Sequence, residues 1–382
     1  MAKRKDLYKE DGVNVPAGDV FSAFCKKVAE KTHHVQPYVQ FHDLSQGNFR
    51  GPRGYRLVGL PKNCIETGVT DGVGTKVVLI VAAGNVQTTA SGLIAMTGMD
   101  ITRWGGLPLV FLNILDMRAL DEVNSPTFAA YQEMMLGLGA LAYQHRFVIL
   151  SGETAELGLC VGSENPTSSI MFNWGGVMLG VYHQDKMILG STLKPGQSVI
   201  ALPDDFRNNG ISSVRKAFAL HYGSEWWNNP EAKKDLLAAA SSSAQYDRML
   251  NDAHGWFNSR SGFAPKFKMH LIVHLSGGAI ESKFGEDMLK PLELSANLTN
   301  LCSPPEIMRR CAEWRGMDSW ECYRTWNGGQ GALVVVDQED EIAFIAHAKR
   351  YNIDAQPAGK ITRRRKYNVS VKSKFDGKTI HY

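Results

Sequence analysis

A short glycine-containing segment near residue 73 holds the residue types that phosphate chemistry most often needs. It reads Thr70, Asp71, Gly72, Val73, Gly74, Thr75 and Lys76. Glycines let the backbone approach a phosphate chain, a carboxylate can hold magnesium, and a lysine supplies positive charge. The GxxxxGK spacing of a Walker A loop is absent, however. A tight turn with a hydrogen-bonded aspartate explains the same residues, so this segment alone leaves phosphate binding open.

A second segment, residues 151–156, combines two carboxylates with a glycine. Gly152, Glu153 and Glu156 follow an apolar run at residues 147–150. Ligands of α/β proteins bind at the carboxyl ends of strands, so Glu153 is a candidate metal or ligand contact. Carboxylates in the first turn of a helix also stabilise its dipole. The start of a helix is therefore the alternative interpretation.

Two further glycine turns lie in the second half of the chain. His274 precedes Gly277 and Gly278, and backbone NH groups in such a turn can bind phosphate. A lone histidine is nevertheless more often structural than catalytic. Residues 327–331 contain three glycines ahead of an apolar run, and a β-bulge or tight turn would explain them equally well.

Short apolar runs rich in β-branched residues predict the strands that position these segments. Each is bounded by Gly, Pro or polar residues, and stretches with helical periodicity lie between them. Ser125 ahead of Pro126 is a helix-start signal. This alternation predicts an α/β (α+β layered) fold. The predicted strands are residues 77–81, 109–112, 147–150, 176–181, 198–202, 271–274, 332–336 and 367–371; the predicted helices are 20–31, 91–104, 126–144 and 212–222, with a helical region over 232–257.

The length of 382 residues suits two domains of ordinary size. A connection at residues 193–197 predicts the boundary, which gives an N-terminal domain of residues 1–192 and a C-terminal domain of residues 193–382. The formal net charge of +4 is too small to indicate nucleic-acid binding. The basic run at residues 363–366 is predicted to be a solvated surface.

The cysteines and the apolar runs bear on the cellular compartment. Six scattered cysteines lack the CxxC spacing of a zinc site, so we expect reduced thiols. Residues 1–19 lack the apolar stretch of a signal peptide, and the apolar runs elsewhere are too short to span a bilayer. We therefore expect a cytoplasmic protein without nucleic-acid or membrane partners.

The order of the segments resembles phosphoribosylformylglycinamidine cyclo-ligase, also called aminoimidazole ribonucleotide synthetase. The resemblance covers nearly the whole chain, and the strings DGVGTK and GETAE are specific to this enzyme and its close relatives. The matching strings are YKEDGV (residues 8–13), DGVGTK (71–76), GETAE (152–156), HLSGG (274–278) and YRTWN (323–327).

This resemblance implies a homodimer in which N-terminal strands of both subunits form a central barrel and each subunit adds a C-terminal α/β domain. It implies ATP and Mg²⁺ as cofactors and a small-molecule nucleotide as substrate. ATP phosphorylates the formyl oxygen of formylglycinamidine ribonucleotide, the amidine nitrogen attacks, and phosphate leaves as the imidazole ring closes in purine biosynthesis. Phosphoryl transfer needs charge neutralisation and positioning more than a nucleophilic side chain.

The resemblance also implies roles for individual residues. Asp71, Lys76 and His274 are the catalytic candidates. Asp71, Asp100 and Glu153 are the candidate magnesium ligands. The ATP side comprises Asp71, Gly72, Gly74, Thr75, Lys76, Asp100 and Glu153, and the substrate side comprises Arg207, Asn209, Gly210, His274, Gly277 and Gly278.

Departures from the family concentrate on the substrate side. Arg207 stands where a histidine is expected, which removes an acid/base candidate although an arginine can still hold an anion. Other departures are Met99 ahead of Asp100, Ser242 to Ala244 in place of a Pro-Thr-Arg signature, Gln330 in the last glycine cluster, and Arg50 and Arg53 in the glycine-rich loop. Three hypotheses stay open: a working cyclo-ligase, a related ATP-dependent enzyme with another amide or nucleotide substrate, and a non-catalytic binding or scaffold homologue.

Overall fold

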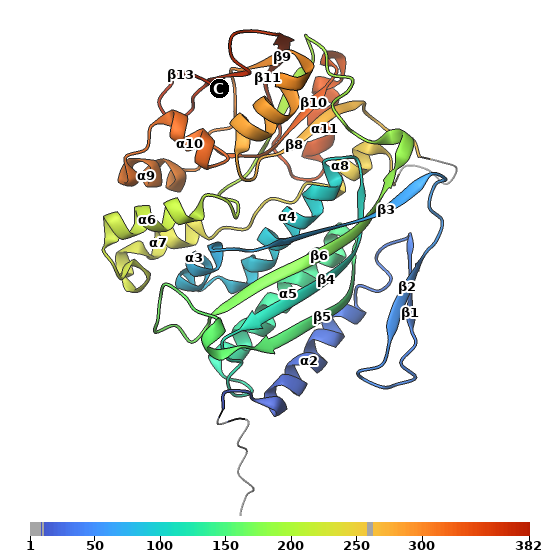
Figure 1. The fold of residues 1–382 in the computed structure, drawn as a ribbon, viewed down its shortest axis with the longest axis vertical. Helices are drawn as coiled ribbons and strands as arrows, with labels where there is room; N and C mark the ends of the chain where they lie inside the picture. Colours follow the sequence, from blue (N-terminus) through green and yellow to red (C-terminus); the bar gives the residue numbers. More distant parts are fainter. Residues whose placement is uncertain (1–8, 10, 258–262) are drawn as a thin grey trace, which may run out of the picture.

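A computed structural model describes residues 9, 11–257 and 263–382. Of the YKEDGV string, Tyr8 and Glu10 lie outside the described residues. The first half of the chain builds a four-stranded sheet with helices and a separate two-stranded hairpin (Figure 1). Its elements are α2 (Val15–Glu30), β1 (Val39–Asp43), β2 (Arg53–Leu57), β3 (Cys64–Gly72), α3 (Lys76–Ala83), α4 (Thr89–Thr102), β4 (Leu107–Met117), α5 (Pro126–His145), β5 (Val148–Glu156) and β6 (Phe172–His183).

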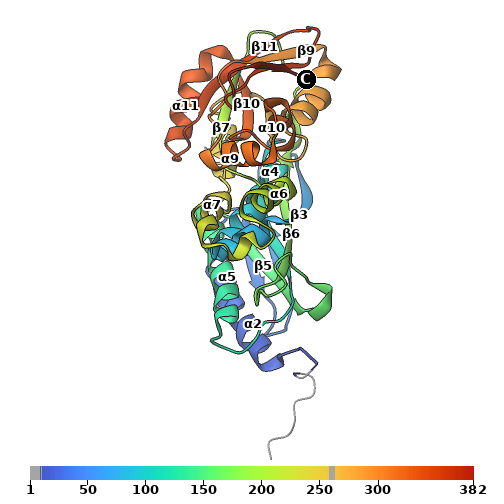
Figure 2. The ribbon, with the colours of Figure 1, turned by 90° about the vertical axis from the view of Figure 1, so that its left-hand side faces the viewer.

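The second half builds a seven-stranded sheet flanked by helices, and it lies above the first in the views of Figures 1 and 2. Its elements are β7 (Ser198–Pro203), α6 (Ile211–Tyr222), α7 (Lys233–Ala239), α8 (Asp247–His254), β8 (Met269–His274), the wide-turned π-helix η6 (Ile280–Leu289), β9 (Leu294–Leu298), α9 (Glu306–Arg315), α10 (Ser319–Thr325), β10 (Gln330–Val336), α11 (Glu341–Lys349), β11 (Gln356–Arg363), β12 (Val369–Lys372) and β13 (Thr379–His381). The mixed α/β architecture confirms the predicted fold class.

The four-stranded sheet is open and has the order β3-β6-β4-β5. Strands β4 and β5 are parallel, whereas β6 runs antiparallel to both of its neighbours. Helices α4 and α5 cover one face, and α2 lies beside the edge strand β5 (Figure 1). In residues 112–117 of β4 buried and accessible residues alternate, with Leu115 inside and Ile114 on the opposite, open face, whereas residues 107–111 are all buried. The side-chain period of two therefore assigns each strand residue to a face.

The seven-stranded sheet has the order β13-β12-β9-β11-β7-β10-β8. Its pairs are antiparallel except for β12 with β9. Strand β10 is buried along its whole length, as expected of an apolar strand with neighbours on both sides. The carboxyl end of β8 carries His274, so this sheet delivers that histidine to the junction with the first half.

Helix α4 joins the two halves of the molecule. All but one of its residues are buried, and it contacts β3, β4, β6, α5 and α8. Small residues permit this burial: at Gly98, an added Cβ would lie 2.3 Å from Oδ2 of Asp247 in α8. The single residue that is not fully buried is Asp100, near its C-terminus. A central apolar helix therefore presents one carboxylate at the junction.

Residues 77–81, which we predicted as a strand, form helix α3 instead. A short apolar run cannot be assigned by periodicity alone. Here Gly74 turns the chain at φ +61° directly after β3, and Gly84 ends the helix in the left-handed conformation. Leu79, Ile80 and neighbouring residues then pack in the common core with α7. Tertiary packing therefore favours a helix here, although the β-branched residues by themselves favour a strand.

The other predicted elements are present, but β4 and β5 run five and six residues past their predicted ends, and the helical region predicted over 232–257 is two helices, α7 and α8, joined by non-helical residues 240–246. Helix α5 begins at Pro126 as predicted, and Oγ of Ser125 accepts a hydrogen bond from the backbone NH of Phe128 at 3.1 Å. Strand β5 extends to Glu156, so residues 151–156 belong to the strand and do not begin a helix. All six cysteines are free thiols.

The change from one sheet to the other falls at residues 184–197, on either side of the predicted boundary at residue 192. The packing is less cleanly divided, because α6, α7 and α9 share a hydrophobic core with α3, α4 and α5. We propose domains of residues 1–192 and 193–382 on the basis of the sheets. No helix in residues 11–257 or 263–382 is long and apolar enough to cross a membrane.

Candidate functional site

Two carboxylates, Asp71 and Asp100, converge at the junction of the two halves. Asp71 lies near the end of β3 on the face that α4 covers, and Asp100 lies near the end of α4. Burial raises the pKa of Asp71, and the negative charge of Asp100 raises it further. Its Oδ1 accepts a hydrogen bond from the NH of Gly72 at 2.6 Å. Two neighbouring carboxylates at a half-buried position form a cation-attracting site.

His274 reaches this carboxylate pair from the second half. Its Nδ1 lies 3.4 Å from Oδ1 of Asp100, and the ring is completely buried. Burial lowers the pKa of His274 to about 3, with the positive charge of Arg207 acting in the same direction. For Asp100, burial would raise the pKa, but the hydrogen bond with His274 and nearby positive charges outweigh it and lower the pKa. The pair is therefore a neutral imidazole beside an ionised carboxylate.

Arg207 lies behind His274 and determines which imidazole nitrogen carries the proton. Its Nη1 is 3.0 Å from Nε2 of His274. A guanidinium can only donate, so Nε2 must accept and the hydrogen of the neutral ring sits on Nδ1, facing Asp100. The side chain is only 3% exposed. It also contacts Oδ2 of Asp204 (2.7 Å) and the carbonyls of Ala244 (3.1 Å) and Ala95 (3.4 Å).

This placement shows what Arg207 contacts in the folded chain. The guanidinium is surrounded by groups of the protein itself, and Arg207 lies behind His274 rather than at an open surface. In this structure the guanidinium contacts His274 and Asp204, and the substrate contact stays a prediction. Arg207 acts as a positioning residue, because it orients the histidine that contacts Asp100.

Lys76 also contacts groups of the protein itself. It is 1% exposed, and its ammonium donates to the carbonyl of Phe206 and, at 3.0 Å, to the carbonyl of Ser241. Burial lowers the pKa of Lys76 to about 8, against the opposing effect of Asp204. In this structure Lys76 links the two halves, and its role in neutralising phosphate charge stays a prediction.

The glycines predicted for the site border the carboxylate pair. The side-chain amide of Asn208 donates to the carbonyl of Gly72 at 3.4 Å. A Cβ added to Gly277 would lie 3.4 Å from the side-chain Nδ2 of Asn209. Gly210 has φ +72° and packs directly against residues 325 and 326. The turns at Gly72, Asn209 and Gly277 thus meet at one place. Gly74 and Thr75 are exposed beside them, and Gly278 follows at φ +77°.

Glu153, by contrast, does not join Asp71 and Asp100 within one chain. The strand register places Asp71 in one row across the sheet with Gly176, Asn113 and Gly152. Asp71 and Gly152 are therefore three strand spacings apart, or about 14 Å. Glu153 follows Gly152 and therefore points to the opposite, open face. Among the described residues, no three His, Cys, Asp or Glu side chains are grouped to hold a metal ion. The predicted three-carboxylate metal site is therefore not assembled in a single chain.

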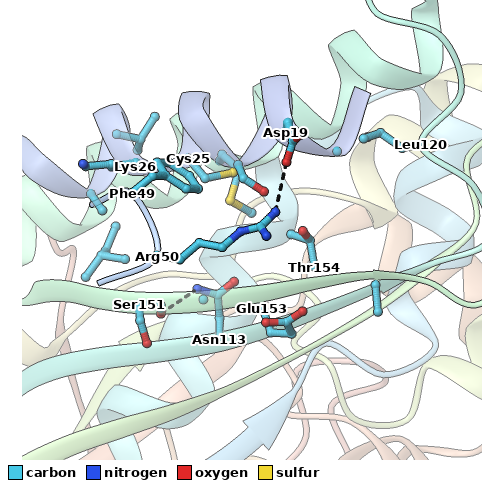
Figure 3. Close-up of a pocket in the computed structure, with 18 of the residues that line it drawn as sticks. Asp19, Cys25, Lys26, Phe49, Arg50, Asn113, Leu120, Ser151, Glu153 and Thr154 are labelled. Carbon is cyan, nitrogen blue, oxygen red and sulfur yellow. Dashed lines mark hydrogen bonds and ion pairs between the residues drawn. The ribbon is translucent and has the colours of Figure 1, made fainter. Parts of the chain in front are cut away.

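Glu153 lies instead beside a cavity of about 640 Å³ between α2, β5 and the loop at residues 49–53 (Figure 3). Arg50 crosses this cavity toward α2, where its Nη2 lies 3.3 Å from Oδ1 of Asp19. Asn113 and Ser151 lie on the sheet side, joined by a 3.5 Å hydrogen bond. The wall also contains Lys26 and Arg53. This second candidate region combines positive side chains with the GETAE strand.

One charged residue at the carboxylate pair was missed by the sequence analysis. Lys283 lies in η6, directly after the Gly277–Gly278 turn, and its ammonium donates to Oγ of Ser276. Its charge acts on Asp71, Asp100 and His274 alike. No motif marked it, because only the π-helical turn brings this position back toward the turn that precedes it.

The chain is similar over nearly its full length to curated proteins of one name. Phosphoribosylformylglycinamidine cyclo-ligase of Citrifermentans bemidjiense is 25% identical over 365 residues, which cover 95% of this chain and 97% of that protein. The protein of the same name from Myxococcus xanthus is 27% identical over 361 residues, covering 93% and 95% of the two chains. No protein-family model matches the chain.

Solved structures with the same fold carry other names. The hydrogenase maturation protein HypE, crystallised in complex with ATP, aligns with a TM-score of 0.57 at 14% identity, covering 89% of each chain. Thiamine-monophosphate kinase of Stenotrophomonas maltophilia aligns with a TM-score of 0.55 at 12% identity, covering 92% of this chain and 95% of that one. At these identities the likeness establishes the mixed α/β fold of this chain and nothing finer.

Proposed function

We propose that this protein is an ATP-dependent cyclo-ligase that converts formylglycinamidine ribonucleotide to aminoimidazole ribonucleotide, with release of ADP and phosphate. The observation that carries the proposal is the Asp71–Asp100 carboxylate pair, which meets the His274 and Gly277 turn at the junction of the two halves. The full-length similarity to proteins of that name supports it. The predicted localisation in the cytoplasm belongs to the same proposal.

The carboxylate pair fits a magnesium ion that also binds nucleotide phosphates. Mg²⁺ is usually bound by one or two carboxylates, with phosphate oxygens and water completing its shell. Asp71 and Asp100 would hold the ion, which when bound would neutralise charge on the transferred phosphoryl group. The NH groups of Gly72, Gly74 and Thr75 are the candidate contacts to the phosphate chain.

The reaction requires two substitutions in sequence. The formyl oxygen attacks the γ-phosphorus of ATP, ADP leaves, and the amidine nitrogen then attacks the activated carbon and expels phosphate with loss of a proton. The protein must position these groups and balance their charge. His274, held neutral with Nδ1–H toward Asp100, orients that carboxylate. Asn209, Gly210, Gly277 and Gly278 are the candidate substrate contacts on the opposite side of the pair.

Glu153 enters this proposal through a second copy of the chain. The resemblance implies a homodimer in which the sheets of two subunits join in a barrel, and the open face of the four-stranded sheet is the surface available for this. Glu153 lies on that face, whereas Asp71 lies on the covered one. We propose that Glu153 serves the site of the partner subunit rather than that of its own chain. The cavity bordered by Arg50 and Glu153 would then hold another part of the ATP molecule.

The test is turnover of the purified protein with ATP, magnesium and formylglycinamidine ribonucleotide. Phosphate release should match formation of aminoimidazole ribonucleotide one to one. ATP binding without that product would reject the cyclo-ligase and favour the related enzyme on another substrate. Arg207, at a position where the resemblance leads us to expect a histidine, favours this second candidate. If neither ATP nor a ribonucleotide raises the melting temperature, a scaffold role remains, since a ligand at 100 times its Kd adds about 2.7 kcal/mol.

A further inference from the structure

We propose that Lys283 is a further catalytic residue, whose ammonium contacts the phosphate oxygens of ATP at the Asp71–Asp100 pair. The inference rests on the proposed function, because it takes the carboxylate pair as the magnesium and phosphate site. It reassigns to Lys283 the charge-neutralising role that the sequence suggested for Lys76.

The backbone around Lys283 brings its side chain back toward the site. After His274 the chain turns at Gly277 and Gly278, and Ala279 adopts an unusual φ of +35° before η6 begins. A positive φ in a residue other than glycine, and a π-helical turn, both occur preferentially at functional sites. The result is that the Lys283 ammonium hydrogen-bonds to Oγ of Ser276, two residues beyond His274.

Charges around Lys283 match a phosphate contact. The carboxylates of Asp71 and Asp100 act on its ammonium, and it acts on theirs. Among the described residues, however, no carboxylate lies within ion-pair distance of the Lys283 Nζ. The lysine therefore interacts with Asp71 and Asp100 by longer-range electrostatics only. An ammonium has three donors, and the hydrogen bond to Ser276 uses one. Two donors therefore remain for an anion that sits between the lysine and a bound cation.

Two of the other cations of this region are committed to protein groups. Lys76 donates to two backbone carbonyls, and Arg207 is enclosed by Asp204 and His274. Arg103 lies 3.7 Å from Oδ1 of Asp100, with its guanidinium over the ring of Trp104 at 4.5 Å. Transfer of a phosphoryl group requires positive charge at the oxygens where negative charge is concentrated. Lys283 and Arg103 both keep donors for that purpose, and Lys283 differs from Arg103 in having no carboxylate within ion-pair distance among the described residues.

The experiment compares Lys283→Met with Lys283→Arg and with Lys290→Met, all in the full-length protein. Lys290 is a matched control because it lies at the end of the same segment, exposed and paired with Glu286. Binding of MgATP and of AMP is measured by calorimetry, together with kcat and KM for ATP. We expect Lys283→Met to weaken MgATP binding about 10-fold, to leave AMP binding unchanged and to lower kcat about 100-fold. Lys283→Arg should recover part of both losses, and Lys290→Met should resemble the wild type.

The outcomes separate this inference from the proposed function. Unchanged MgATP affinity and kcat in Lys283→Met would overturn the inference and leave the function intact. Equal weakening of MgATP and AMP would also overturn it, because a phosphate contact must discriminate between them. If the wild type binds MgATP but makes no aminoimidazole ribonucleotide, the selective loss in Lys283→Met still supports the inference while the cyclo-ligase fails. If the wild type binds no MgATP, both are rejected. Should Lys283→Met unfold, the same comparison is made with Lys283→Gln.

Discussion

The junction and the cavity are two differently constructed regions of the same molecule. At the junction, His274 is fully buried and Arg207 is 3% exposed, and each is held by partners from the other elements. In the cavity, Arg50 and Asp19 form an ion pair whose side chains are 80% and 63% exposed. Exposed pairs contribute about 0–1 kcal/mol, whereas breaking a buried pair costs several times more. The junction is therefore held by buried interactions of the protein itself, while the Arg50–Asp19 pair adds little to the stability of the cavity wall.

The largest expected effect is on activity at the junction. Asp71→Asn removes one carboxylate of the pair while keeping the size of the side chain. We expect turnover to fall at least about 100-fold because the cation site loses half of its charge. Phosphate release measures turnover, and thermal unfolding should show an intact fold.

Exchange of subunits between two variants serves as the control for Asp71→Asn. Chains with Glu153→Gln, mixed with Asp71→Asn chains under conditions that exchange subunits, should regain part of the activity if the site is shared between subunits. Undiminished turnover of Asp71→Asn itself would remove Asp71 from the cation site and would make the cavity the more important region.

The next effect is on stability. Arg207→Met leaves the carboxylate of Asp204 buried without its partner, so the free energy of unfolding should fall by about 3–5 kcal/mol. Urea denaturation measures this change. In the double variant with Asp204→Asn the loss should be smaller, since no unpaired charge remains. A loss below about 1 kcal/mol in the single variant would show that the junction is less organised than its contacts indicate.

A pH effect should follow from Asp247, which packs against α4 at Gly98. Burial raises its pKa to about 7 from 3.8. The folded chain therefore retains a proton that the unfolded chain has released. The stabilisation is fully present below pH 3.8 and is lost as the pH rises through about 7. Between pH 5 and pH 8 the free energy of unfolding of the wild type should therefore fall by about 2–3 kcal/mol relative to that of Asp247→Asn.

Urea denaturation of both proteins at the two pH values measures the Asp247 effect. The variant supplies its own control, because titration of every other group is common to the two proteins. A constant difference between wild type and variant would mean that Asp247 titrates alike in the folded and unfolded chains.

The smallest effect belongs to the cavity. Arg50→Ala removes an exposed ion pair with Asp19 and should change the free energy of unfolding by less than about 0.5 kcal/mol. The melting temperature of the free protein should therefore stay the same, while the stabilisation that MgATP adds should decrease. A large loss of stability without ligand would contradict the contrast between the two regions.

Much of the backbone was predictable from local pattern. Alternating or continuous apolar runs identified β4, β5, β6, β7, β8 and β10, and the Ser125–Pro126 pair marked the start of α5. These signals are local because side-chain period, caps and glycine turns act within a few residues. The apolar run of α3 was mistaken for a strand for the same reason, since a short buried helix and a short buried strand share one composition.

The sequence by itself determined that glycine turns, Asp71, Asp100 and His274 belong to one constellation, because their order along the chain resembles a single family. Only the tertiary structure decided what each charged side chain does. Lys76 meets carbonyls of residues 206 and 241, and Glu153 takes the face opposite Asp71, because strand register and packing between the halves set these positions. Lys283 is positioned at the site by a turn that no local sequence pattern predicts. A residue's type follows from the sequence, but its partners depend on segments that are distant along the chain.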